Sequence, residues 1–339
     1  MRKLLWRPLR ALTLAPAAAV VLACSGCVDQ DSSPGVEGAP ADPEAWEGDL
    51  AEATRPLRPS EGTEEDWLVL RETVIRAWEE GLDTLPLGES MVRIASYFVG
   101  TTYTPGTLEV AGREDVVINF QEFDCVTLVE NVFTLARFIR SADPGLLESD
   151  IRTRELYRRL LGEIRYWGGR VDGYPSRLHY FSDWIRDNEA RGLVQELTQQ
   201  LGGEEDRKAI DFMSTHPEAY RQLADPRNLS AIRGVEFDLS SSTRFKIPEG
   251  EIATWSSWIQ DGDIIAATST VDGLDVAHTG LAVWQGAELH LLHAPLVGEV
   301  VEVSRLPLAD RILRLAGQDG IRVTRPIDQE PGGQEESHP

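Results

Sequence analysis

Cysteine is scarce in this 339-residue sequence, which contains only Cys24, Cys27 and Cys125. Exported proteins usually use cysteine in pairs, as disulfides. Cys24 and Cys27 both lie in an N-terminal segment with the features of an export signal, so Cys125 is the single cysteine in the body of the chain. A lone thiol in such a compartment needs a reason, and nucleophilic chemistry is one. The alternative is a buried cysteine that acts as a small hydrophobic side chain.

Basic residues are also in short supply, with 33 Lys and Arg against 56 Asp and Glu and a net charge of −23. Binding to nucleic acid requires a basic surface that neutralises phosphates, so we expect no nucleic-acid partner. The same acidic balance disfavours electrostatic adsorption to an anionic membrane. The apolar fraction of 42% is large enough for a full hydrophobic core.

The apolar run at the N-terminus, Ala11 to Ala23, is too short to span a bilayer and follows a basic start, as in an export signal. It ends in V-L-A-C, which resembles a bacterial lipobox in which Cys24 is lipidated and becomes the mature N-terminus. Lipidation at Cys27, or an ordinary cleaved signal with two incidental cysteines, is the alternative. We therefore expect a lipoprotein signal peptide at residues 1–24 and a lipid anchor in the bacterial cell envelope. Because Ser25 is not an inner-membrane retention aspartate, the periplasmic side of the outer membrane is favoured.

Composition and periodicity divide the rest of the chain. Residues 25–62 are rich in Pro, Gly, Ser and acidic residues and predict a disordered tether, and residues 328–339 predict a disordered tail. The body, residues 63–327, begins with helical periodicity and changes to a two-residue period in its last third, which indicates the α+β class. The predicted strands are Asp263 to Ala267, His278 to Trp284, Glu288 to Ala294, Glu299 to Ser304 and Ile321 to Thr324.

A mostly buried helix is predicted to begin at Cys125, because apolar residues recur at helical spacing from Val126 to Ile139. Asp124 occupies the N-cap position, where a carboxylate accepts the free amides of the first turn. The helix dipole stabilises a thiolate at this end, and the free N–H groups there can bind an oxyanion. The position therefore favours a reactive cysteine over a packing cysteine.

Two histidines are predicted to share one face of a β-hairpin. If Gln285-Gly286 forms a two-residue loop, His278 lies directly opposite His293, and His290 lies on the other face. The small residues beside the pair leave room for the helix of Cys125, with His278 as base and His293 as the residue that orients it. The alternatives are a zinc site, disfavoured because Cys125 has no Cys-x-x-Cys partner, and partly exposed strand histidines.

Six short motifs follow one another along the body of the chain. They are Y-T-P-G-T-L-E at 103–109, V-V-I-N-F-Q-E-F-D-C-V-T at 116–127, R-L-H-Y-F-S-D-W-I at 177–185, G-D-I-I-A at 262–266, G-L-D-V-A-H-T-G-L-A-V at 273–283 and H-A at 293–294. In number and order they resemble the NlpC/P60 cysteine peptidases of bacterial cell walls, and more closely the amidase-like DUF1460 branch. The resemblance extends over residues 64–327.

The resemblance implies a papain-like α+β fold, in which the nucleophile helix packs on the C-terminal antiparallel sheet. It implies an N-acetylmuramoyl-L-alanine amidase that cuts between the lactyl group and L-Ala of peptidoglycan fragments, the muropeptides, without a metal or organic cofactor. Cys125, His278 and His293 match the catalytic triad of the superfamily, and Tyr103 and Asp124 match positions near the substrate.

The chain departs from the wider superfamily at two points. D-C-V-T replaces the common D-C-S-G, and the gap between the two histidines is longer. Three other functions therefore stay open: a γ-D-glutamyl-diamino-acid endopeptidase, an acyltransferase, and a non-catalytic lipoprotein that binds wall fragments.

Three residues have both a structural and a functional interpretation. Asp124 can cap the helix or pair with a substrate amine, and Tyr103 can line the pocket or pack in the core. His179 lies in a segment dense in polar and aromatic groups, which suits contact with sugar or peptide but is also typical of a buried turn.

Overall fold

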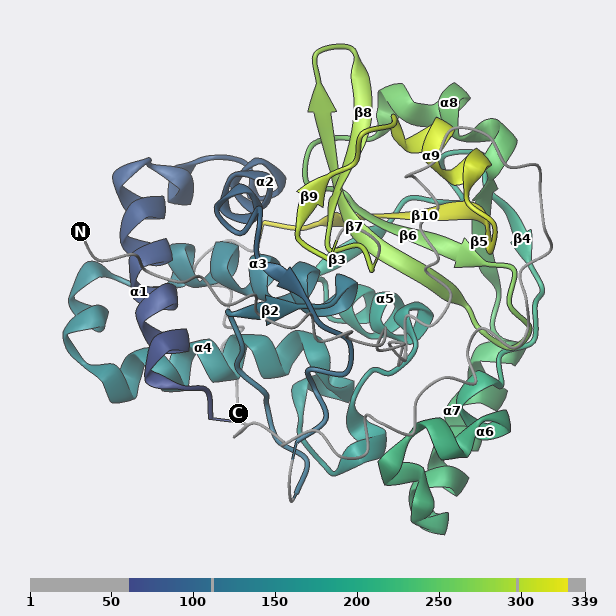
Figure 1. Cartoon of the computed structure of the whole chain (residues 1–339), viewed down its shortest axis with the longest axis horizontal. Coiled ribbons are helices and arrows are strands. Elements are labelled where there is room, and N and C mark those ends of the chain that lie inside the picture. The colour runs from purple at the N-terminus through teal and green to yellow at the C-terminus, as the bar shows by residue number, and fades with distance from the viewer. Residues whose placement is uncertain (1–60, 111–112, 297–298, 329–339) are drawn as a thin grey trace, which may run out of the picture.

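The computed structural model of the chain describes residues 61–110, 113–296 and 299–328. The predicted signal peptide with Cys24, the tether as far as residue 60 and the tail from residue 329 lie outside these residues. N-terminal helices pack beside a C-terminal antiparallel sheet, which confirms the predicted α+β class (Figure 1). No helix of the described residues is long and apolar enough to cross a membrane.

The N-terminal half is helical. Its α-helices are α1 (Glu64–Glu79), α2 (Leu87–Tyr97), α3 (Cys125–Ser141), α4 (Asp150–Arg165) and α5 (Phe181–Ala190). Short 3-10 helices at Leu82–Thr84, Pro144–Glu148, Trp167–Gly169 and Tyr174–Ser176 connect them. A small parallel pair, β1 (Thr102–Tyr103) and β2 (Glu122–Phe123), leads into α3.

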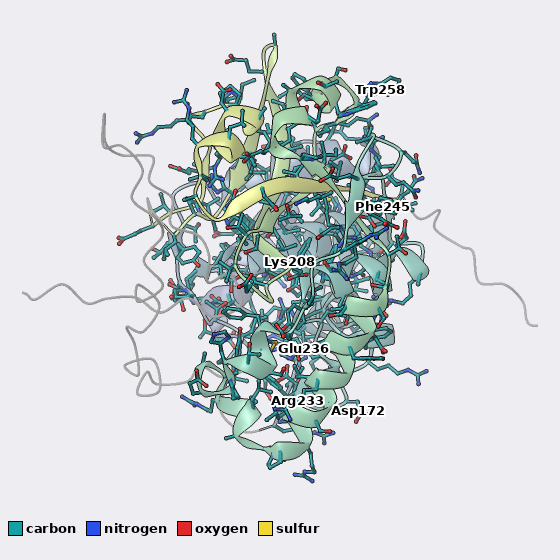
Figure 2. The ribbon with its side chains drawn as sticks, turned by 90° about the vertical axis from the view of Figure 1, so that its right-hand side faces the viewer. Asp172, Lys208, Arg233, Glu236, Phe245 and Trp258 are labelled. Carbon is teal, nitrogen blue, oxygen red and sulfur yellow. The ribbon has the colours of Figure 1, made fainter. Side chains whose placement is uncertain are left out.

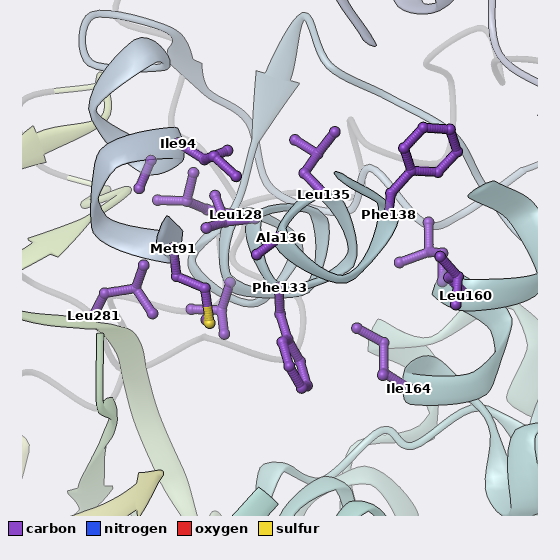
Figure 3. Close-up of a cluster of buried hydrophobic side chains, with 14 of the residues drawn as sticks. Met91, Ile94, Leu128, Phe133, Leu135, Ala136, Phe138, Leu160, Ile164 and Leu281 are labelled. Carbon is purple, nitrogen blue, oxygen red and sulfur yellow. The ribbon is translucent and has the colours of Figure 1, made fainter. Parts of the chain in front are cut away.

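α3 is buried along most of its length, as its apolar periodicity predicts. In Figure 3, Leu128 and Phe133 lie near Met91 of α2 and Leu281 of the sheet, and α4 lies on the other side of the helix. Burying each such side chain contributes roughly 1.5–3 kcal/mol. This packing fixes the axis of α3 and therefore the place where the helix begins.

The sheet of the C-terminal half has the strand order β4-β5-β10-β6-β7-β8-β9, with β3 also paired to β10. All of these pairs are antiparallel. The strands are β3 (Val194–Glu196), β4 (Glu204–Asp206), β5 (Arg244–Pro248), β6 (Ile264–Ser269), β7 (Val276–Gln285), β8 (Glu288–His293), β9 (Glu302–Val303) and β10 (Gln318–Pro326). β9 is shorter and β10 longer than predicted, and β3, β4 and β5 were not predicted.

The two faces of this sheet meet different neighbours. Leu281 of β7 and Leu292 of β8 belong to the core that the sheet shares with the N-terminal helices. The next residue on β7, Ala282, belongs to a second core together with α9 (Leu308–Arg314). Successive side chains of a strand point to opposite faces, so α3 and α9 cover opposite faces of β7.

A further helical segment attaches to the edge of the sheet. It contains α6 (Phe212–Thr215) and α7 (Pro226–Ser241), with 3-10 helices between them at Pro217–Ala219 and Arg221–Ala224. After β5 comes another short helix, α8 (Ile252–Trp255), which is flanked by 3-10 helices at Glu249–Glu251 and Ser256–Trp258. Tyr180 O–H donates to Glu236 at 2.7 Å and accepts from the Met213 N–H at 2.9 Å. Figure 2 views this side, with Arg233 and Glu236 on α7. The buried tyrosine therefore joins this segment to the N-terminal half.

Candidate active site

The N-terminus of α3 is capped by its own residues. The Asp124 carboxylate accepts hydrogen bonds from the Thr127 N–H at 2.7 Å and from Thr127 Oγ1–H at 2.8 Å. The Asp124 N–H donates to Thr127 Oγ1 at 2.9 Å, which completes a capping box. Burial raises the pKa of the Asp124 carboxyl, against the effect of these hydrogen bonds. The predicted N-cap is confirmed, and contact between Asp124 and a substrate amine stays a prediction.

Cys125 is the first residue of α3, is 1% exposed and packs against Val126 and Leu296. Among the described residues Cys125 is the single cysteine, and its role as a nucleophile stays a prediction. The chain's other two cysteines, Cys24 and Cys27, lie outside the described residues. A nucleophilic role requires the reduced sulfur, because the thiolate is the nucleophilic form.

The start of α3 is bonded to the strand that carries the candidate base. Thr279 Oγ1 of β7 donates a hydrogen bond of 2.8 Å to the Cys125 carbonyl, and both groups are buried. The two residues are 154 positions apart in the sequence. His278 precedes Thr279 directly, so the tertiary fold brings this histidine into the neighbourhood of Cys125.

His278 and His293 form a buried hydrogen-bonded pair. His278 Nε2 lies 2.7 Å from His293 Nδ1, and the rings meet edge to face at a centroid distance of 4.9 Å. Burial and then the charge of Arg311 hold the pKa of His278 well below its usual range. The pKa of His293 is likewise lowered by burial first, and then by His278 and Arg311. Both imidazoles are therefore neutral near pH 7, the form in which a histidine can accept a proton.

The hairpin that carries this pair has a different register from the predicted one. Gln285 pairs with Glu288, so the loop residues are Gly286 and Ala287. Gly286 has a φ of 65°, the positive value that a type II′ loop requires at its first position. The prediction that His278 lies directly opposite His293 is wrong. The loop has moved by one position along both strands, which keeps both histidines on one face of the sheet and changes only their stagger.

The small residues beside the histidines do not make room for α3. A Cβ at Gly280 would lie 2.8 Å from the Leu292 carbonyl oxygen and 2.9 Å from the His293 Cβ, so glycine permits the close approach of β8. Ala282 packs in the core of α9, whereas α3 packs on the face of Leu281. The predicted position of the nucleophile helix beside these small residues is therefore wrong.

A β-bulge lies immediately before the candidate base. The pairing of β6 with β7 shifts between Ala267, which faces His278, and Thr268, which faces Val276. Ala277 is the extra residue of this bulge. Bulges bend a strand, increase its twist and re-aim the neighbouring side chains. The bulge residue Ala277 therefore directly precedes His278 and influences the direction of the His278 side chain. That direction decides whether His278 can accept a proton from the Cys125 thiol.

His290 and His293 of β8 have different hydrogen-bond partners. His290 Nδ1 lies 2.8 Å from the Ser304 carbonyl oxygen, and its residue pairs with Val283, which packs against the core of the helices. His293 instead meets His278. Of the two candidates for the third position, the structure places His293 beside the base.

Tyr103 is held next to the segment that leads into α3. It pairs with Phe123 across β1 and β2, and the Thr104 N–H donates to the Phe123 carbonyl at 2.9 Å. The Tyr103 side chain is buried and belongs to the main hydrophobic core. The Tyr103 side chain therefore packs in the core, and the residue pairs with Phe123, which lies two residues before Cys125, whereas its contact with substrate stays a prediction.

His179 is tied to an aromatic neighbour. Its Nε2 lies 2.9 Å from the Tyr174 carbonyl oxygen, and its ring packs on the Tyr174 ring at a centroid distance of 4.3 Å. Burial and the charge of Arg177 lower the pKa of His179 to about 3. Close by, the Ser182 N–H at the start of α5 donates to Asp275 Oδ2 at 2.7 Å. The segment of His179 is thereby fastened to the residues that precede β7.

The family of the chain follows from its similarity to known proteins. A family described as AmiA-like, N-acetylmuramoyl-L-alanine amidase-like, matches residues 93–317. The chain belongs to this family. The DUF1460 resemblance is thereby confirmed. No curated protein shows a significant match to the chain.

Several solved structures are similar to this chain. An N-acetylmuramoyl-L-alanine amidase from Bacteroides uniformis is 36% identical, with a TM-score of 0.66, and the match covers 71% of this chain and 99% of the amidase. A putative xylanase from Bacteroides fragilis is also 36% identical, with a TM-score of 0.62 and coverage of 68% and 98%. A DUF1460 protein from Legionella pneumophila is 21% identical, with a TM-score of 0.57 and coverage of 80% and 98%, and shows the fold alone.

Two features near the site were missed by the sequence reasoning. One is the bond from Thr279 to Cys125, and the other is a buried ion pair between Arg165 of α4 and Glu130 of α3 at 2.7 Å. No local pattern reveals either, because each joins residues that are far apart in the sequence.

Within the described ranges, no group of three or more His, Cys, Asp or Glu side chains could hold a metal ion.

Proposed function

We propose that the chain is a cysteine amidase of the cell wall, which hydrolyses the amide between the lactyl group of muramic acid and L-Ala in peptidoglycan fragments. The hydrogen-bonded pair of His278 and His293 carries this proposal, because His278 lies on the strand that is bonded to Cys125. Membership of the amidase-like family supplies the reaction class. The 36% identity to the Bacteroides uniformis amidase favours the same bond as the target.

The ring nitrogens of the pair suit a proton relay. If His278 Nε2–H donates to His293 Nδ1, the other nitrogen of His278 is left as an acceptor for the proton of reduced Cys125. His293 then fixes the tautomer and the ring orientation of the base. Both rings are buried and neutral, so the pair accepts the thiol proton during the reaction.

Hydrolysis proceeds in two stages. His278 takes the thiol proton, and the thiolate attacks the lactyl carbonyl to form a tetrahedral oxyanion, for which the Cys125 N–H at the start of α3 is the donor. His278 then gives the proton to the departing nitrogen, which releases the peptide with a free L-Ala amine. Water attacks the remaining thioester with His278 as base, releasing the muramic carboxylate and restoring the thiol. Every proton and bond is accounted for without a metal or organic cofactor.

We also propose a location for the protein in the cell envelope. A lipid on Cys24 anchors the chain on the periplasmic side of the outer membrane, and residues 25–62 act as the tether that lets the catalytic domain, residues 63–327, reach muropeptides. The papain-like arrangement belongs to the same proposal, in which α3 carries the nucleophile and the sheet carries the base. In this proposal the reduced sulfur of Cys125 is the reactive form, because the thiolate is the nucleophile.

The test is digestion of a disaccharide-tripeptide muropeptide by the full chain, with and without a thiol reductant, followed by mass spectrometry of the products. We expect a free tripeptide and an intact disaccharide. A disaccharide that keeps L-Ala and D-Glu would identify the endopeptidase instead. Peptide release without an added acceptor argues against acyl transfer, and no product under either condition would refute catalysis.

A further inference from the structure

We propose that Thr279 is a positioning residue: its hydroxyl holds Cys125 at one place along the strand that carries His278. The inference rests on the proposed function, because it concerns the distance between the sulfur and its base. Its basis is the buried 2.8 Å hydrogen bond from Thr279 Oγ1 to the Cys125 carbonyl. This bond joins the first residue of α3 to the neighbour of the base directly, with no intervening side chain.

The acceptor of this bond is in a position where orientation matters. Cys125 is the N1 residue of α3, and its carbonyl already accepts the N–H of the residue four positions later in the helix. A carbonyl oxygen has two lone pairs, so Thr279 uses the second. The helical bond runs along α3, whereas the bond to Thr279 runs across to β7. Together they fix the plane of the peptide that follows Cys125 and thereby the direction of the Cys125 side chain.

The donor is equally well fixed. Thr279 is 1% exposed and lies opposite Ala266 of β6, a small residue in the same core. Consecutive Cα atoms are about 3.8 Å apart, so a bond at position 279 limits how far the start of α3 can slide relative to His278. The α3 cap at Asp124 does not do this, because its partner Thr127 lies in the same helix.

Two buried polar contacts join α3 to α4. Tyr157 of α4 donates to Asn131 at 2.7 Å, and Arg165 of α4 donates to Glu130 at 2.7 Å. Neither of these contacts joins α3 to β7. Thr279 supplies a polar link in that direction, in addition to the apolar packing of Leu281.

The expected effect is on the rate of the chemical step. A displacement of about 1 Å between reacting groups can cost 10²-fold in rate. We expect Thr279→Val, which keeps the shape and removes the hydroxyl, to lower kcat by about tenfold and to leave KM within about twofold. Thr279→Ser, which keeps the donor, should recover most of the lost rate.

The matched control is Thr324→Val. Thr324 of β10 is fully buried, pairs with Ile264 on the same face of the sheet, and its Oγ1 has no hydrogen-bond partner among the described residues. Both valine variants remove one buried hydroxyl from one sheet face, so only the bond to Cys125 differs. We expect Thr324→Val to have the kcat of the wild type.

A second measurement tests the environment of the Cys125 sulfur without relying on turnover. The rate at which iodoacetamide alkylates reduced Cys125 should be followed against pH, by mass spectrometry of the peptide that contains it. We expect the midpoint to move in Thr279→Val and to stay in place in Thr279→Ser and Thr324→Val, with circular dichroism confirming that all are folded. Equal kcat values and equal midpoints for the two valine variants would overturn the inference. If the wild type shows no turnover, the proposed function fails, and the alkylation profile alone then decides the role of Thr279.

Discussion

The two faces of β7 carry different chemistry at adjacent positions. On one face, the Thr279 hydroxyl bonds to Cys125 and Leu281 packs in the core of the helices. On the other face, His278 meets His293, and Ala282 packs in the core of α9. Anchoring of the nucleophile and proton transfer are therefore assigned to neighbouring residues of one strand. Substitutions on both faces should therefore lower the rate, by displacing the sulfur on one face and by removing the base on the other.

Within this comparison of the two faces, the largest expected effect comes from removing the proposed base on the histidine face. We expect His278→Ala to lower kcat/KM by at least about 10³-fold, since a positioned general base contributes up to 10⁴-fold. The measurement is the rate of peptide release from a defined muropeptide by the reduced enzyme. His290→Ala is the control, because His290 belongs to the other face and bonds to the Ser304 carbonyl. Equal losses of kcat/KM in His278→Ala and His290→Ala would contradict the assignment of the base to the face of His278.

The second prediction concerns how the helix is held on its side away from the sheet. Arg165 and Glu130 form an ion pair in which both side chains are at most 2% exposed. We expect Arg165→Met to lower the free energy of unfolding by about 3–5 kcal/mol, because it leaves a buried carboxylate without its partner. Urea denaturation measures this change.

Arg154→Met provides the matched comparison, because Arg154 pairs with Glu64, whose side chain is 86% exposed. An exposed pair contributes about 0–1 kcal/mol, so this variant should be nearly as stable as the wild type. Similar losses of unfolding free energy in the two variants would show that the buried pair contributes no more to stability than the exposed pair.

The third prediction is a dependence of stability on pH. Burial lowers the pKa of His179 from 6.5 to about 3, so below pH 6.5 the unfolded chain binds a proton that the folded chain does not. The free energy of unfolding then falls as the pH decreases, by at most about 1.4 kcal/mol per pH unit, until the pH approaches the folded pKa. His278 and His293 act in the same direction.

His179→Gln removes this contribution and keeps an N–H donor for the Tyr174 carbonyl. Between pH 6.5 and pH 5, its unfolding free energy should fall by about 2 kcal/mol less than that of the wild type. Urea denaturation at both pH values gives the difference. Parallel losses in the two proteins would contradict the lowered pKa of His179.

The smallest expected effect is at the cap of α3. Asp124→Ala should lower the free energy of unfolding by about 1 kcal/mol, whereas Asp124→Asn, which still accepts the Thr127 N–H, should differ by a few tenths. A rise of KM in Asp124→Asn, at unchanged stability, is the result expected if the carboxylate also pairs with a substrate amine. An unchanged KM would restrict Asp124 to its role as a cap.

Local patterns predicted the parts of the site that depend on local spacing. The N-cap at Asp124 and the buried α3 follow from residues within a few positions of each other, and the structure has both. The hairpin prediction gave the correct face for His278 and His293 but the wrong stagger. Side-chain alternation fixes the face, whereas the turn geometry at Gly286 decides the stagger.

Contacts between distant segments could not be predicted in this way. The bond from Thr279 to Cys125 spans 154 positions, and nothing in the neighbourhood of either residue indicates it. The short strands β3, β4 and β5 are likewise defined by their partners in the sheet, and their residues show no extended alternation.

The most direct test of the account compares kcat/KM of the reduced wild type with that of reduced Cys125→Ala on the same muropeptide. Without the sulfur no thioester can form, so we predict a loss of at least about 10⁴-fold with the far-UV circular dichroism of the wild type retained. Hydrolysis by the alanine variant within about tenfold of the wild type would contradict the account.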